Sequence, residues 1–218
     1  MNKTGIGVVG VPGSGKSRFA SALKRALPEY NFSIIDGYAE KLSEKLKMAV
    51  GVDATYLSNV HVSSLREQEI RKNVLDEKNF IVCGTMFDTL CYSGFHAEIV
   101  ANTAGNQESI NGFLAREMTA AQMFAYLAID TYSNLSHLFY LPITDPELLV
   151  AVANKENAES FPGNPEILDK TIQDALRRYG SPATILNDKH GKNVQQAIEI
   201  IKSGKNGTHA DANLVSGE

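Results

Sequence analysis

The stretch Gly10-Val11-Pro12-Gly13-Ser14-Gly15-Lys16-Ser17 fits the pattern G-x-x-x-x-G-K-[ST] at every fixed position. Glycines in this pattern let the backbone turn tightly, so that consecutive N–H groups can point at phosphate oxygens. A chance match in a chain of 218 residues has a probability on the order of 1% at ordinary residue usage. We therefore expect these residues, called the phosphate cradle below, to bind the phosphates of a nucleotide.

The sequence on both sides of the phosphate cradle supports this interpretation. The apolar run at 6–9 precedes it, and a helical pattern of Phe19, Ala22, Leu23 and Ala26 follows it. A helix that begins near Lys16 adds the positive end of its dipole to the site. Lys16 is expected to reach the β- and γ-phosphates, and the Ser17 hydroxyl is expected to ligate Mg²⁺. The residues expected to contact the nucleotide are Gly10, Pro12, Gly13, Ser14, Gly15, Lys16 and Ser17.

Short apolar runs along the chain predict the strands of a sheet. The runs do not alternate with polar residues, which is typical of parallel strands that are covered on both faces. Helical patterns separate them, including a long one from about 106 to 132. This order predicts an α/β protein with a doubly wound, five-stranded parallel sheet. The expected strands are 6–9, 32–35, 80–83, 137–141 and 183–186.

Composition and charge limit the classes of partner. The chain is 43% hydrophobic and 21% charged, as expected for one globular domain with a core of its own. We expect that domain to span 1–203, followed by a flexible Gly-, Asn- and Ser-rich tail at 204–218. The net charge of -4 does not favour non-specific nucleic-acid binding, which needs clustered Lys and Arg. A homodimer is left open.

The cysteines and the hydropathy pattern indicate a cytoplasmic location. Cys83 and Cys91 have no paired spacing, which favours reduced thiols in a cytosolic protein. The start of the sequence lacks the basic and apolar regions of a signal peptide. No apolar run approaches the ~20 residues that cross a bilayer, so no membrane partner is expected.

The rest of the chain distinguishes between classes of protein with such a cradle. A GTPase needs an Asp-x-x-Gly switch and, after it, an Asn-Lys-x-Asp loop. Here the segment 154–157 ends in Asn157, and the only Asp-x-x-Gly, at 188–191, comes after it. A motor-type ATPase needs Asp-Glu at the end of the third strand, but no acid occurs there before Asp88. A kinase fits better than either.

Two further segments strengthen the kinase interpretation. Asp36-Gly37-Tyr38-Ala39-Glu40 is similar to the Glu-Tyr-Ala-Arg stretch of riboside-kinase-like proteins, and 84–92 is similar to their Asp-Arg-Ser-x-x-Asp-Ser-x-Ala-Tyr. In element order, 5–202 resembles the small P-loop nucleoside and nucleotide kinases, which include thymidylate-kinase-like, nicotinamide-riboside-kinase-like and phage-encoded nucleotide kinases. The resemblance implies transfer of the γ-phosphoryl group of ATP, with Mg²⁺, to a small nucleotide or nucleoside. It also implies a lid at about 153–164.

The chain departs from this family at three places. The Asp-Arg pair of the family is Gly84-Thr85 here, the Arg of the first segment is Glu40, and the lid offers only Lys155 as a cation. Turnover then depends on Lys155 or on a distant arginine, or it is lost. The arginines considered are Arg116, Arg177 and Arg178. The alternatives are therefore a kinase acting on a modified base in DNA and a catalytically degenerate nucleotide-binding protein.

Lys16, Asp36 and Asp88 are the candidate catalytic residues. Asp36 ends a strand on the edge where doubly wound folds bind ligands, so it is a candidate base and, with Ser17, a candidate Mg²⁺ ligand. The alternative is a helix N-cap. Asp88 is expected within one helical turn of the third strand, either facing the same crevice or acting as a plain first-turn acid.

Four residues are assigned with less support from the pattern. Tyr38 and Tyr92 are candidates for stacking on an acceptor base, against ordinary packing of half-buried aromatics. Arg66 and Arg71 lie at a position that contacts acceptor phosphate in related kinases. The charged run around them, however, favours a solvated helix face.

Overall fold

A computed structural model of the chain describes residues 3–11, 13–37, 41, 44–45, 47, 56–85, 87–89, 134–142, 165–178, 183–187 and 190–204. Several sequence predictions fall outside these residues. They concern Pro12, Tyr38, Glu40, Cys91, Tyr92, the helix at 106–132, Arg116, the lid at 153–164 with Lys155, and the tail beyond 204.

The predicted sheet is confirmed. Its five strands run in the order β2-β3-β1-β4-β5, and every neighbouring pair is parallel. Each strand begins and ends within two residues of the predicted run, and β1, β3 and β4 are buried along their whole length. The strands are β1 (Gly5–Val9), β2 (Ser33–Ile35), β3 (Phe80–Cys83), β4 (His137–Tyr140) and β5 (Thr184–Ile185).

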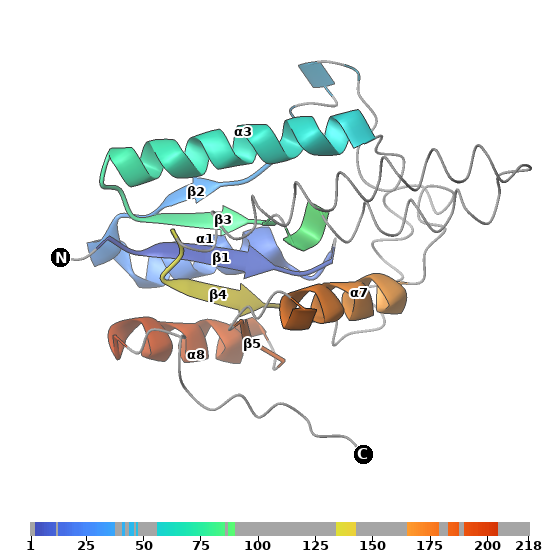
Figure 1. Cartoon of the computed structure of the whole chain (residues 1–218). Helices are drawn as coiled ribbons and strands as arrows, with labels where there is room; N and C mark the ends of the chain where they lie inside the picture. Colours follow the sequence, from blue (N-terminus) through green and yellow to red (C-terminus); the bar gives the residue numbers. More distant parts are fainter. Residues whose placement is uncertain are drawn as a thin grey trace, which may run out of the picture.

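Helices cover both faces of the sheet (Figure 1). The described helices are α1 (Lys16–Ala26), the short 3-10 helix η1 (Pro28–Tyr30), α3 (Tyr56–Leu75), α7 (Pro165–Arg178) and α8 (His190–Lys202). α1 and α8 pack together against one face, and α3 packs on the opposite face over β2 and β3. The first residues of α3 lie on the side of the molecule toward which the strands point. No helix within the described ranges is both long and apolar enough to span a membrane.

Apolar side chains fill the layer between the sheet and α1. Phe19 packs edge-on against Phe139 of β4, with 5.9 Å between the ring centres. Phe19 and Leu23 are buried as predicted, but Ala26 is exposed and Leu27 is buried instead. The buried stripe of the helix is centred between Ala20 and Leu23, so Ala26 lies outside it.

Candidate active site

The phosphate cradle connects the central strand β1 to α1, at the carboxyl edge of the sheet. After β1 the chain continues to β2 and β3 on one side of this strand and then crosses to β4 on the other. Ligands of doubly wound folds bind at such a switch point. Gly13 and Gly15 have φ angles of 80° and 86°, in the left-handed region where a side chain is strained. The local backbone therefore requires glycine where the motif has it.

The first glycine of the motif is required for a different reason. A Cβ atom at Gly10 would lie 2.5 Å from Ser14 Oγ and 2.6 Å from the carbonyl oxygen of Leu141. The cradle therefore packs directly on the backbone that follows β4. Gly15 forms the N-cap of α1 and provides no side chain to cap the first helical N–H groups. These N–H groups are then free of a capping side chain and suit an anion.

Lys16 extends along the inside of the phosphate cradle. Its Nζ donates hydrogen bonds to the carbonyl oxygens of Gly10 and Val11, and it lies 3.6 Å from Asp88 Oδ1. Only 17% of its side chain is exposed. The ammonium group is thus held at the loop by acceptors that a phosphate can replace. Ser17, the last residue of the cradle, is exposed in the first turn of α1.

Asp88 connects the phosphate cradle to the backbone that follows β3. Residues 87–89 are helical, and the Thr85 hydroxyl accepts a hydrogen bond from the Phe87 N–H at 3.2 Å. Asp88 Oδ2 accepts in return from the Thr85 N–H at 2.6 Å, which completes a capping box. Its other oxygen, Oδ1, accepts from the Gly10 N–H at 3.2 Å. Asp88 is therefore both a first-turn acid and a buried neighbour of Lys16.

Asp36 comes directly after β2, the strand that pairs with β3. The residue is half-buried, and its Oδ1 accepts a hydrogen bond from the Gly37 N–H at 2.8 Å. The Lys41 N–H donates to the Gly37 carbonyl at 3.1 Å. Because β2, β3 and β1 are parallel, Asp36 follows its strand at the same edge of the sheet as the cradle.

The Cys83 thiol, at the end of β3, lies among the charged groups of the site. Its pKa is raised to about 12, with burial as the largest cause; the negative charge of Asp36 also raises it, by more than the positive charge of Lys16 lowers it. Asp88 acts in the same direction as Asp36. Lys16, Asp36 and Asp88 thus come within electrostatic reach of one side chain, although they follow three different strands. Cys83 itself is a free, buried thiol that stays protonated near neutral pH.

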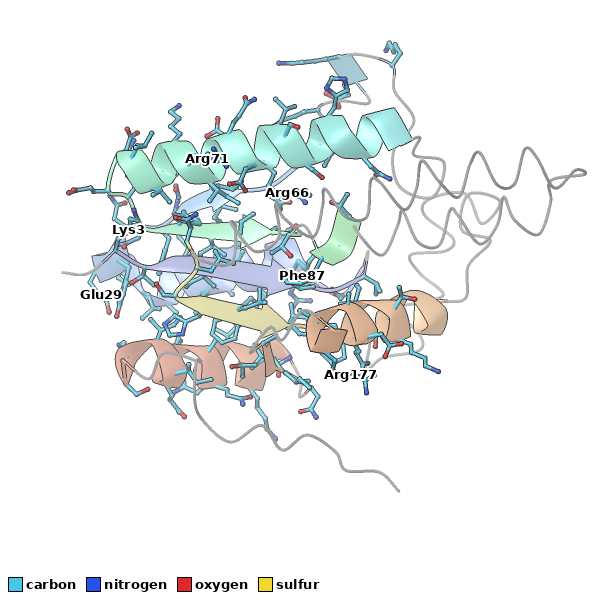
Figure 2. All side chains as sticks on the ribbon, in the orientation of Figure 1. Lys3, Glu29, Arg66, Arg71, Phe87 and Arg177 are labelled. Carbon is cyan, nitrogen blue, oxygen red and sulfur yellow. The ribbon has the colours of Figure 1, made fainter. Side chains whose placement is uncertain are left out.

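The prediction of a solvated face on α3 is wrong for Arg66. This side chain is half-buried on the sheet side of the helix, and its Nη1 donates to the Thr85 carbonyl oxygen at 3.0 Å and to Thr89 Oγ1 at 3.4 Å (Figure 2). Arg71 does lie on the outside, with 58% of its side chain exposed, and its Nε donates to Glu67. A signal was present in the sequence, because Arg66 lies four residues from both Val62 and Ile70, which are buried.

The arginines considered as replacements for the lid arginine of the family either lie away from the cradle or fall outside the described residues. Arg177 on α7 is 60% exposed and forms an ion pair with Asp174. Figure 2 shows it directed away from the sheet. The side chain of Arg178 is not among those described. Among the described arginines, Arg66 is the one whose guanidinium group lies close to Asp88, since both side chains lie within 4 Å of the Cβ position of Gly84.

Comparisons with known proteins agree with this geometry at the level of the fold. No family model matches the chain, and no curated protein matches its sequence. Among solved structures, NadR in complex with NR superposes with a TM-score of 0.62 at 12% identity, over 96% of this chain and 53% of that one. The chain thus spans about half the length of NadR.

Two further structures match over nearly their whole length. Deoxyadenosine kinase from M. mycoides with bound dATP has a TM-score of 0.56 at 14% identity, over 91% of this chain and 100% of that one. Thymidylate kinase from Candida albicans has a TM-score of 0.52 at 14% identity, over 94% of both chains. The predicted resemblance to P-loop nucleoside and nucleotide kinases is confirmed in the fold, which this chain shares with them.

Proposed function

We propose that this protein transfers the γ-phosphoryl group of ATP to a small nucleoside or nucleotide. The observation that supports this most directly is the placement of Lys16. Its ammonium group lies inside a glycine-rich loop at the head of α1, with Asp88 3.6 Å away. Phosphoryl transfer depends mainly on positioning and on stabilising charge, and such a loop supplies both.

Donor binding follows from the hydrogen bonds of the phosphate cradle. Lys16 Nζ bonds the carbonyl oxygens of Gly10 and Val11 in the nucleotide-free loop. When ATP binds, its β- and γ-phosphate oxygens take over these bonds, and the N–H groups at the start of α1 hold the remaining oxygens. A charged acceptor is a stronger partner for the ammonium than a carbonyl group is.

The oxygens of the site fit Mg²⁺, which usually keeps several waters and takes only one or two protein ligands beside the phosphates. The described residues contain no cluster of three or more acidic, His or Cys side chains able to enclose a metal. The exposed Ser17 side chain at the end of the cradle matches this small number of protein ligands, with Asp36 as the second candidate ligand. Bound there, the ion would neutralise charge on the phosphates.

On the acceptor side, Asp36 is the proposed base. Its carboxylate is half-buried at the end of β2 and bonds the Gly37 N–H through one oxygen. The other oxygen can accept the proton of an acceptor hydroxyl as the new phosphate ester forms. Asp88 suits this role less, because backbone N–H groups already occupy both of its oxygens.

A second candidate function is nucleotide binding without turnover. It is favoured by Gly84-Thr85, which stands where the resembled kinases carry Asp-Arg. Transfer of label from γ-labelled ATP to nucleosides, nucleoside monophosphates and oligonucleotides distinguishes the candidates, with Lys16→Ala as the control. Label on a small acceptor supports the proposal, and label on oligonucleotides alone would favour a kinase acting on DNA. ATP binding by calorimetry without any transfer would replace the proposal with a binding protein.

A further inference from the structure

Two charged side chains, those of Arg66 and Asp88, lie close to Gly84 at the end of β3. The Gly84 φ of 71° is in the left-handed region. A Cβ atom at this position would lie 3.4 Å from Arg66 Nη2 and 3.8 Å from Asp88 Cγ. A guanidinium group from α3 and a carboxyl group from the 84–89 turn therefore lie next to the same point. A Cβ atom would make ordinary van der Waals contact with both groups, so the left-handed φ, and not the space, is what favours glycine.

A continuous path of hydrogen bonds leads from Arg66 to the phosphate cradle. Arg66 Nη1 donates to the Thr85 carbonyl oxygen at 3.0 Å. The N–H of the same Thr85 donates to Asp88 Oδ2 at 2.6 Å, and the Gly10 N–H donates to Asp88 Oδ1 at 3.2 Å. The path thus joins α3 to the first amide of the cradle. Asp88 is only 6% exposed, so water competes little for these bonds.

We propose that Arg66 is a positioning residue of the nucleotide site. By holding the Thr85 carbonyl and the Thr89 hydroxyl, it fixes the 84–89 turn, and that turn presents Asp88 to Gly10 and Lys16. In this role the guanidinium group does not touch the nucleotide. The inference rests on the proposed function only insofar as ATP is the ligand of the cradle.

Arginine suits this position better than lysine. A single nitrogen, Nη1, donates to two acceptors on different residues of the turn, Thr85 O and Thr89 Oγ1. Its planar guanidinium group holds both N–H directions fixed, whereas a lysine ammonium on a flexible chain loses more rotamer freedom for the same bonds. The 20-residue helix α3 provides a rigid support for the side chain. Arg66→Lys should therefore keep part of the effect and Arg66→Met should lose it.

The first test measures amide hydrogen exchange by NMR on the nucleotide-free protein. Arg66→Met should accelerate exchange at Gly10 and Thr85 by roughly tenfold relative to the amides within β1, because their acceptor Asp88 is no longer held. Arg66→Lys should give an intermediate rate. The matched control is Arg71→Met, on the same helix but 58% exposed, which should change neither amide. Equal acceleration of Gly10, Thr85 and β1 would show a general loss of stability and overturn the proposal.

A second comparison tests whether Arg66 acts through Asp88. In an Asp88→Asn background, Arg66→Met should add little to the exchange rate at Gly10, because the group that transmits its effect is already altered. Independent, additive accelerations would contradict the path described above. Calorimetry with ATP completes the test, and Arg66→Met should weaken ATP binding severalfold with partial recovery in Arg66→Lys. If the unsubstituted protein binds no ATP, the proposed function fails, while the exchange rates still decide the role of Arg66.

Discussion

The two faces of the sheet bury different kinds of side chain. Beneath α1 and α8 the buried groups are almost all apolar, with Phe19, Leu23 and Phe139 among them. Beneath α3 the apolar cluster formed by the described residues is small, and polar residues share the buried face. They are Asn59, Ser63, Glu67 and Asn73, with Arg66 half-buried among them. Polar burial is costly unless hydrogen bonds compensate, so we infer that the first face mainly stabilises the fold and the second orients groups for the site.

Hydrogen bonds on the α3 face support this difference. Asn73 donates through Nδ2 to the Glu69 carbonyl and accepts from the Ser33 hydroxyl of β2 at 2.6 Å. Such bonds fix the direction and register of a helix, which apolar packing alone does not do. A helix that carries Arg66 toward the 84–89 turn needs that precision.

The largest effect on stability is expected on the apolar face. Leu23→Ala should lower the free energy of unfolding by about 2–5 kcal/mol, because it leaves a cavity in a close-packed layer. Ser63→Ala, on the other face, is the matched comparison, since both residues are fully buried. Ser63 Oγ bonds no group in the part of the chain that the structure describes, so its removal should be nearly neutral. Urea unfolding measures both, and equal losses would abolish the distinction between the faces.

Asp36→Asn should have its main effect on catalysis. Asparagine keeps the shape of the side chain but cannot accept a proton, so turnover should fall by ~10²-fold or more, in the range of general-base contributions. ATP affinity and the unfolding midpoint should change little, because the residue is half-buried and the Oδ1 of asparagine can still accept the bond from the Gly37 N–H. Label transfer and calorimetry provide the two measurements.

Unlike Asp36→Asn, Asp88→Asn should also lower the stability of the fold, because Asp88 is buried. The amide nitrogen of asparagine would face either the Gly10 or the Thr85 N–H, where two donors cannot bond. We therefore expect a loss of stability of ~1–3 kcal/mol in addition to any loss of turnover. If transfer occurs and both Asn variants retain it fully, the assignment of carboxylates to the site is wrong even though the fold is right.

Lys16→Ala should weaken ATP binding by about ten- to a hundredfold and abolish transfer, since a charge-assisted contact is worth ~1.5–3 kcal/mol. In the nucleotide-free protein the substitution also removes the positive charge that lies 3.6 Å from the buried Asp88 carboxylate, so the free energy of unfolding should fall as well. Calorimetry on the folded variant decides the point. Unchanged affinity would remove Lys16 from the nucleotide site.

Local patterns predicted the sheet and the phosphate cradle because each depends on residues that are adjacent in sequence. Unalternating apolar runs marked the strands, and one eight-residue motif marked the loop. The capping box at Thr85 and Asp88 was also readable, as T-x-x-D after a strand. The contact of Asp88 with Gly10 was not, because it joins residues 78 positions apart. Arg66 was misplaced because a run of charges outweighed its spacing from Val62 and Ile70.

The smallest expected effect concerns His137, a titratable group buried on the apolar face. Its ring stacks on Phe139 with 6.1 Å between centres, and burial lowers its pKa. As the pH falls through about 6.5, the ordinary pKa of histidine, the unfolded chain therefore takes up a proton at His137 more readily than the folded protein does. Stability should fall as the pH drops below about 6.5, by at most ~1.4 kcal/mol per pH unit.

Urea unfolding at several pH values between 7.5 and 5 tests this contribution of His137. Replacing the ring in His137→Phe should flatten the dependence, because the titrating group is gone while the stacking surface is kept. His61→Gln is the control, since His61 lies exposed on α3 and should leave the slope unchanged. If His137→Phe keeps the full slope, the loss of stability at low pH arises from other groups. His137 would then make no contribution to the pH dependence of the free energy of unfolding.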